Sequence, residues 1–130
     1  MRAQLMAQDT VAYAAAQAQQ IATLVTAPGD VARVQAWGRD SDRVAVIAAM
    51  SDMLGEDLRP RLAAIKAPTL VMGSWIAYKD QSTMEATRAI YERQYKDLAG
   101  VQIAMSPAGR HFIMLDDPTW FEKTLESFVP

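Results

Sequence analysis

The chain of 130 residues has the length of a single domain. Its 13 basic and 15 acidic side chains nearly cancel and do not cluster, which excludes the basic surface of a nucleic-acid-binding protein. No apolar run approaches the ~20 residues needed to span a bilayer, and the first residues lack the apolar stretch of a signal peptide. The absence of cysteine excludes disulfides and thiol chemistry. We therefore expect a cytoplasmic protein that binds neither nucleic acid nor membrane.

The first half of the sequence predicts helices. Residues 2–26 are rich in Ala and Gln, which favour helix, and Asp9 could cap a second helix within this stretch. Asp30 follows a Pro-Gly break and could cap the next helix. Ser41 or Asp42 would begin another helix, in which apolar residues recur at helical spacing.

The pattern changes after a last short helix over residues 58–65, which Asp57 is expected to cap. Residues 69–72 form a wholly apolar run closed by Gly73, which predicts a strand buried on both faces of a parallel sheet. Residues 101–105 predict a second strand.

Two further helices are predicted around the second strand. Ser82 and Glu85 form a capping-box pair for the helix between the strands. Asp117 followed by Pro118 is typical of a helix start. Residues 66–130 therefore predict a right-handed βαβ unit with an appended helix. The fold class expected is α/β, with a helical layer over residues 1–65 packed on this small parallel unit in one compact domain.

Two motifs in the second half carry a resemblance to a known family. The run APTLVMG at 67–73 is similar to the next-to-last strand of α/β-hydrolases, and GRHFIM at 109–114 followed by DDP at 116–118 is similar to their closing motif. The resemblance covers residues 57–130, while residues 1–56 are similar in character to the helical cap of esterase-like members. It implies a partial α/β-hydrolase fold that consists of the cap and the last two strands.

The resemblance also implies a site. His111, the one histidine of the chain, matches the general base that follows the last strand in these enzymes. Asp80 is the match to the catalytic acid in the loop after the preceding strand. Asp116 is close to His111 in sequence and could face the same crevice. The G-x-S-x-G motif that holds the family's nucleophilic serine is absent from the sequence.

Without that serine, water must act as the nucleophile. The sequence predicts a hydrolase of small activated esters or phosphoesters, in which His111 activates water with a divalent metal such as Zn or Mn. His111, Asp80 and Asp116 would be the metal ligands, and no organic cofactor is expected. Two alternatives stay open: a catalytically inert dimeric fragment, and the histidine-bearing half of a split serine hydrolase whose nucleophile comes from another chain.

The assembly is predicted from the strand that runs from Thr69 to Met72. A sheet of two strands is rarely stable alone, and an apolar, uncharged strand edge invites pairing with another chain. We therefore expect a homodimer through this edge, with a four-stranded sheet.

Overall fold

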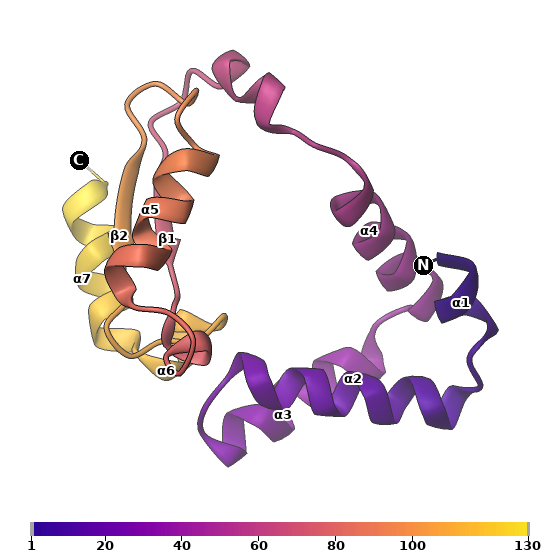
Figure 1. The fold of residues 1–130 in the computed structure, drawn as a ribbon. Coiled ribbons are helices and arrows are strands. Elements are labelled where there is room, and N and C mark those ends of the chain that lie inside the picture. Colours follow the sequence, from indigo (N-terminus) through magenta and orange to yellow (C-terminus); the bar gives the residue numbers. More distant parts are fainter. Residues whose placement is uncertain (1, 130) are drawn as a thin grey trace. The chain divides into compact units, whose positions relative to one another are not determined.

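The computed structural model describes residues 2–129, and the chain divides into two compact units. The helical unit is Met1–Asp57 and the sheet unit is Leu58–Pro130. The chain is mainly helical, and its two strands pair in parallel within the sheet unit (Figure 1). This architecture agrees with the predicted α/β class.

The helical unit is built from four helices joined by short turns. They are α1 (Arg2–Ala7), α2 (Thr10–Leu24), α3 (Pro28–Asp40) and α4 (Arg43–Gly55). Asp9 caps α2 by accepting a hydrogen bond from the Ala12 N–H, and Asp42 caps α4 by accepting one from the Ala45 N–H. The stretch 2–26 is therefore two helices, and Asp42 rather than Ser41 begins the fourth.

The predicted cap at Asp30 is wrong. α3 already begins at Pro28, and the residue before it, Ala27, makes no side-chain cap bond. Proline is favoured in a first turn because its missing N–H has no partner to lose there. Asp30 lies inside that first turn and forms an ion pair with Arg33 at 3.1 Å.

The helical unit has a small apolar core, and one arginine side chain connects three of its helices. The apolar side chains below a tenth exposure are Ile21, Val25, Val34 and Ile47. At the start of α4 the Arg43 guanidinium donates to the backbone oxygens of Leu5 at 2.8 Å and Gln8 at 2.7 Å. Its central carbon also lies 4.3 Å from the centre of the Tyr13 ring. One side chain thus connects α1, α2 and α4.

The sheet unit alternates strands and helices. Its elements are the 3-10 helix η1 (Arg59–Ala64), β1 (Leu70–Gly73), the 3-10 turn η2 (Ile76–Tyr78), α5 (Met84–Gln94), β2 (Gln102–Met105), α6 (Ile113–Asp116) and α7 (Pro118–Phe128). β1 and β2 are in register with Val71 beside Ile103, and α5 and α7 lie on either side of them in Figure 1. The predicted strand–helix–strand–helix order is confirmed, with η2 and α6 as unpredicted additions.

Two predicted caps in the sheet unit are wrong and one is confirmed. Asp57 does not cap the short helix, which is a 3-10 helix that begins at Arg59 without a side-chain cap bond. The cap of α5 is Thr83, whose hydroxyl accepts from the Ala86 N–H at 3.2 Å, so the Ser82–Glu85 capping box is wrong. Asp117 caps α7 as expected, with its carboxylate 3.3 Å from the Trp120 N–H.

The prediction that the first strand is buried on both faces is also wrong. Leu70, Val71 and Met72 are half-buried, and Gly73 alone in β1 is fully buried. A side chain at Gly73 has no room, because its Cβ would lie 2.6 Å from the Met105 Sδ and 2.9 Å from the Tyr91 ring. The tight packing in this unit is therefore at the carboxyl end of the strands.

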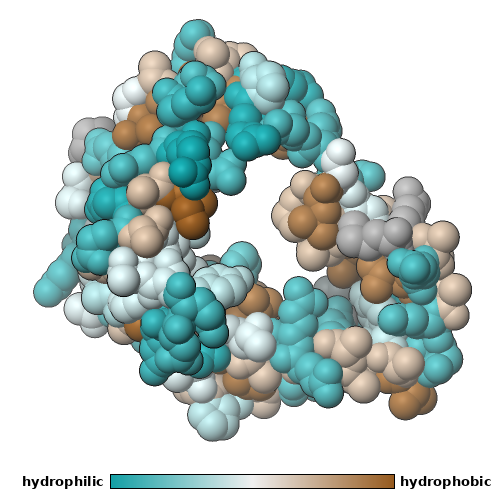
Figure 2. Space-filling model, viewed as in Figure 1, coloured by the Kyte–Doolittle hydropathy of each residue, from teal (hydrophilic) through white to brown (hydrophobic). Residues whose placement is uncertain are grey.

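The surface carries apolar side chains in both units, as the intermixed colours of Figure 2 show. On α4, Val44, Met53 and Leu54 are each more than half exposed. Among residues 2–129, however, every helix is too short or too polar to cross a lipid bilayer.

Candidate functional site

The loop that carries His111 leaves the carboxyl end of β2. Residues 106–112 connect β2 to α6, and β1 ends at the same edge of the sheet because the strands are parallel. The chain after β1, which leads to Asp80, departs from that edge too. In parallel α/β sheets, ligands bind in the crevice outside the carboxyl ends of the strands. The topology therefore puts the start of both predicted site loops at the end of the sheet where ligands bind.

A buried serine holds the His111 loop in place. Ser106 is 0 % exposed, and its hydroxyl oxygen accepts hydrogen bonds from the Gly109 N–H at 2.8 Å and the Ala108 N–H at 3.4 Å. A Cβ at Gly109 would lie 2.9 Å from that oxygen and 3.1 Å from the Ile113 Cα. Only glycine fits this position without moving the backbone, so the loop is tightly packed just before His111.

Asp116 connects the far end of the same loop to α6. Its half-buried carboxylate accepts a hydrogen bond from the Arg110 N–H at 2.8 Å. This bond fixes the backbone of the residue before His111. Asp116 is therefore a positioning residue of the loop in this structure.

The imidazole of His111 is exposed on the braced loop. Its ring meets the Phe112 ring edge to face, with the centroids 5.2 Å apart and an angle of 88° between the planes. Among residues 2–129 no hydrogen bond is formed to the imidazole nitrogens. Both nitrogens are thus open to water or to a substrate.

Asp80 lies on an exposed turn between η2 and α5. The turn is closed by the backbone, since the N–H groups of Gln81 and Ser82 both donate to the Tyr78 oxygen at 2.9 Å. In the described part of the chain, neither a hydrogen bond nor an ion pair joins Asp80 to His111. Within residues 2–129, Asp80 and His111 therefore do not form an acid–base pair.

The predicted metal ligands do not form a metal site in the described chain. Over residues 2–129, the His, Asp and Glu side chains nowhere form a group of three or more that could hold a metal ion. The Asp116 carboxylate is occupied by the Arg110 backbone, and Asp80 is held on a separate turn. As they are arranged within residues 2–129, these donors do not fit Zn or Mn.

The surroundings of two side chains, Ser106 and Trp75, could not be predicted from the sequence. Ser106 organises the His111 loop, although serine in a Ser-Pro-Ala-Gly run is an ordinary turn residue. Trp75 follows β1, and its indole Nε1 is buried without a hydrogen-bond partner in residues 2–129. Both environments depend on which neighbours the fold supplies, so residue order alone does not indicate them.

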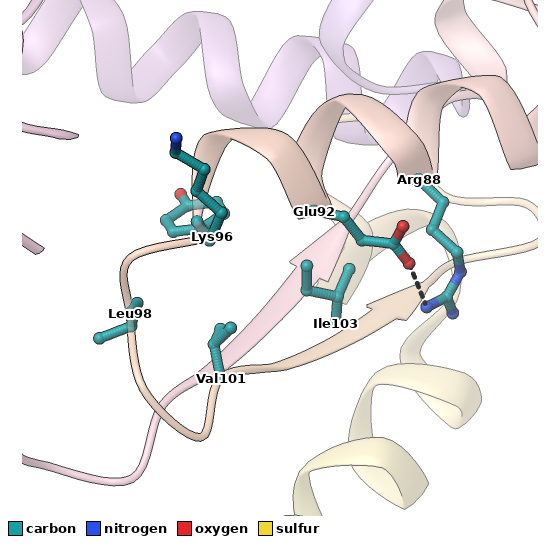
Figure 3. Close-up of a pocket in the computed structure, with 7 residues that line it drawn as sticks. Arg88, Glu92, Lys96, Leu98, Val101 and Ile103 are labelled. Atoms are coloured by element: carbon teal, nitrogen blue, oxygen red, sulfur yellow. Dashed lines mark ion pairs between the residues drawn. The ribbon is translucent and has the colours of Figure 1, made fainter.

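A shallow hollow of about 270 Å³ lies between α5 and β2 (Figure 3). It is lined by Arg88, Glu92, Tyr95, Lys96, Leu98, Val101 and Ile103. Arg88 and Glu92 are neighbours on α5 and form an ion pair at 3.7 Å. Val101 precedes β2 and Ile103 lies within it, and none of the lining residues belongs to the loop of residues 106–112. The hollow is therefore separate from the His111 loop.

Comparison of the chain with protein-family models, with curated proteins and with solved structures found no match.

Proposed function

We propose that this chain hydrolyses small activated esters, with His111 as the general base, on the C-terminal part of an α/β-hydrolase fold. The observation that carries the proposal is the exposed imidazole on a rigidly braced loop at the carboxyl end of a parallel sheet. A base that acts on water needs access to solvent and a fixed position, and this loop provides both.

Water is the nucleophile that the side chains leave available. The chain has no cysteine, and the hydroxyl of Ser106 is fully buried and engaged by two backbone N–H groups. Ser74 follows β1 but leads into a 3-10 turn rather than the strand-to-helix elbow that exposes a nucleophilic serine.

The proposed reaction is a general-base hydrolysis. A free imidazole nitrogen of His111 accepts a proton from water while the water oxygen bonds to the ester carbonyl carbon. The tetrahedral intermediate then collapses, the bond to the leaving oxygen breaks, and the imidazolium returns its proton to that oxygen. Positioned general bases contribute about 10²–10⁴-fold. We therefore expect turnover of esters with good leaving groups, and of phosphotriesters by the same attack at phosphorus.

The test is hydrolysis of p-nitrophenyl acetate and of a p-nitrophenyl phosphotriester by the full chain. His111→Ala should lower the rate above buffer by about 10²-fold or more, because it removes the base. Asp80→Asn and Asp116→Asn are the matched controls. Each keeps size and hydrogen-bonding shape, and the amide oxygen introduced by Asp116→Asn can still accept from the Arg110 N–H. Full activity in His111→Ala would refute the proposal.

A chelator separates this mechanism from the metal-dependent one predicted from the sequence. An unchanged rate after treatment with chelator excludes the metal-dependent mechanism and leaves catalysis by the His111 imidazole alone. Loss of the rate, with recovery on addition of Zn or Mn, would instead establish a metal. A wild-type chain with no activity above buffer would favour the inert fragment. Turnover restored by a second polypeptide with a serine elbow would favour the split hydrolase.

A further inference from the structure

The backbone of β1 has an inner and an outer side. The Gln102 N–H donates to the Thr69 oxygen at 3.0 Å, and the Ser106 N–H donates to the Gly73 oxygen at 2.9 Å. Backbone groups of successive strand residues point to opposite sides, and Val71 is in register with Ile103. The backbone N–H and C=O groups therefore face β2 at Thr69, Val71 and Gly73, and they face outward at Leu70 and Met72.

This outer side lacks a partner strand in the described chain. The sheet formed by residues 2–129 has the order β1–β2, and none of the backbone hydrogen bonds outside the helices and the sheet involves Leu70 or Met72. Natural sheets protect such edges with charged side chains, proline or a bulge. β1 reads Leu-Val-Met-Gly and has none of these.

We propose that the outer edge of β1 pairs antiparallel with the same edge of a second copy of this chain, about a two-fold axis at Val71. In this register Leu70 of one copy faces Met72 of the other, and the two residues exchange both of their backbone hydrogen bonds. The symmetry repeats the exchange on the other side of the axis. Every outward N–H and C=O group of Leu70 and Met72 is thereby satisfied by the strand's own copy, which is why the second copy is the occupant that fits.

The register has a consequence for the active site. Antiparallel pairing puts the carboxyl ends of the two copies of β1 at opposite ends of the four-stranded sheet. The two loops that carry His111 therefore lie apart, and the dimer makes no site with two imidazoles. The inference does not rest on the proposed function, because its test reads assembly and not hydrolysis.

The first test is a single cysteine in a chain that has none. On the axis, the two Val71 residues form a non-hydrogen-bonded pair with Cα atoms about 4.5 Å apart, which suits a disulfide. Val71→Cys should give a covalent dimer on mild oxidation, seen on a gel without reductant. Ala104→Cys is the matched control at an inward-facing position of β2, and it should stay monomeric on the gel. Circular dichroism checks that both variants are folded.

The second test removes an outer donor without touching the inner ladder. Leu70→Pro deletes one outward N–H at the first residue of β1, where proline is tolerated. It should turn a dimeric wild type into a monomer by light scattering, with helix content unchanged. Val71→Pro would instead damage the pairing of β1 with β2. A wild type that is monomeric at micromolar concentration, together with a folded Val71→Cys that does not cross-link, would overturn the proposal. Cross-linking of Ala104→Cys alone would place the interface on β2 and overturn it as well.

Discussion

The two units of the chain differ in what holds their elements together. In the helical unit long polar side chains connect the helices: the Arg43 guanidinium reaches carbonyl groups at the end of α1, and the Gln35 amide of α3 donates to the Ala18 oxygen of α2 at 3.4 Å. In the sheet unit two glycines are closely surrounded, because a Cβ at Gly73 would meet the Met105 and Tyr91 side chains and one at Gly109 would meet the Ser106 hydroxyl and the Ile113 Cα. The comparison teaches that the most crowded glycine positions lie around the His111 loop, whereas long polar side chains connect the helices of the helical unit.

Buried and exposed apolar side chains occur in both units. In the helical unit Ile47 is 1 % exposed and Met53 is 63 % exposed, and in the sheet unit Ile113 is 6 % exposed and Tyr78 is 63 % exposed. Regions with few buried apolar contacts open more readily than well-packed ones. We therefore expect local opening first at the carboxyl end of α4, where Met53 and Leu54 are exposed.

The largest effect is expected at Ile47, the most buried large side chain of α4 at 1 % exposure. Ile47→Ala should lower stability by about 2–4 kcal/mol through lost burial and the cavity left behind. Hydrogen exchange measures the result residue by residue. Protection should fall in α4 and persist in β2, and an equal fall in both units would show that they unfold as one.

Ser106→Ala tests the bracing of the His111 loop. It leaves the Gly109 N–H buried without its acceptor. The free energy of unfolding, measured in urea, should therefore fall by about 1–3 kcal/mol. Ser127→Ala is the control, because the exposed Ser127 hydroxyl donates only to the Thr124 oxygen of its own helix. That change should stay within about 0.5 kcal/mol. Equal costs for the two variants would contradict the importance of the buried hydroxyl.

Arg43→Lys tests the connection of the helical unit. A lysine keeps the charge but lacks the planar guanidinium, which lies over the Tyr13 ring while one of its nitrogens donates to the oxygens of Leu5 and Gln8. We expect a loss of about 1 kcal/mol, the scale of one hydrogen bond. Amide exchange should rise in α1 and remain unchanged in α5, and unchanged exchange in α1 would contradict the role of Arg43.

The smallest effect is expected at Gly29, in the first turn of α3. An added Cβ there meets no atom within 4 Å, so Gly29→Ala should stabilise the chain by about 0.4–1 kcal/mol. Gly109→Ala, the same change in a crowded position, should destabilise it by about 1–3 kcal/mol. Thermal unfolding should therefore show a higher Tm for Gly29→Ala and a lower Tm for Gly109→Ala if Gly109 is the more tightly packed position.

The features predicted correctly from sequence depend on near neighbours in the chain. Asp9, Asp42 and Asp117 cap helices by reaching an N–H three residues further on, so the pattern is complete within one turn. The errors occur where adjacent residues compete for one role. Pro28 starts α3 before Asp30 can cap it, and Thr83 takes the cap position instead of Ser82.

Burial and the candidate site were harder to predict, because both depend on distant neighbours. An apolar run such as Leu70, Val71 and Met72 looks the same in a central strand and in an edge strand, and only the number of partner strands decides its burial. The position of His111 after the second strand followed from chain order. The Ser106 hydroxyl bonds that fix its loop required knowledge of the folded backbone.

The contacts of Arg43 limit how fast trypsin can cleave the chain after this residue. Trypsin must take an arginine side chain into its own pocket, yet this one is engaged with the oxygens of Leu5 and Gln8 and with the Tyr13 ring. Cleavage after Arg43 therefore has to wait until α1 detaches and the first turn of α4 unwinds. The rate of cleavage after Arg43, compared with cleavage after the exposed Arg39, records how often the amino-terminal end of the chain comes loose.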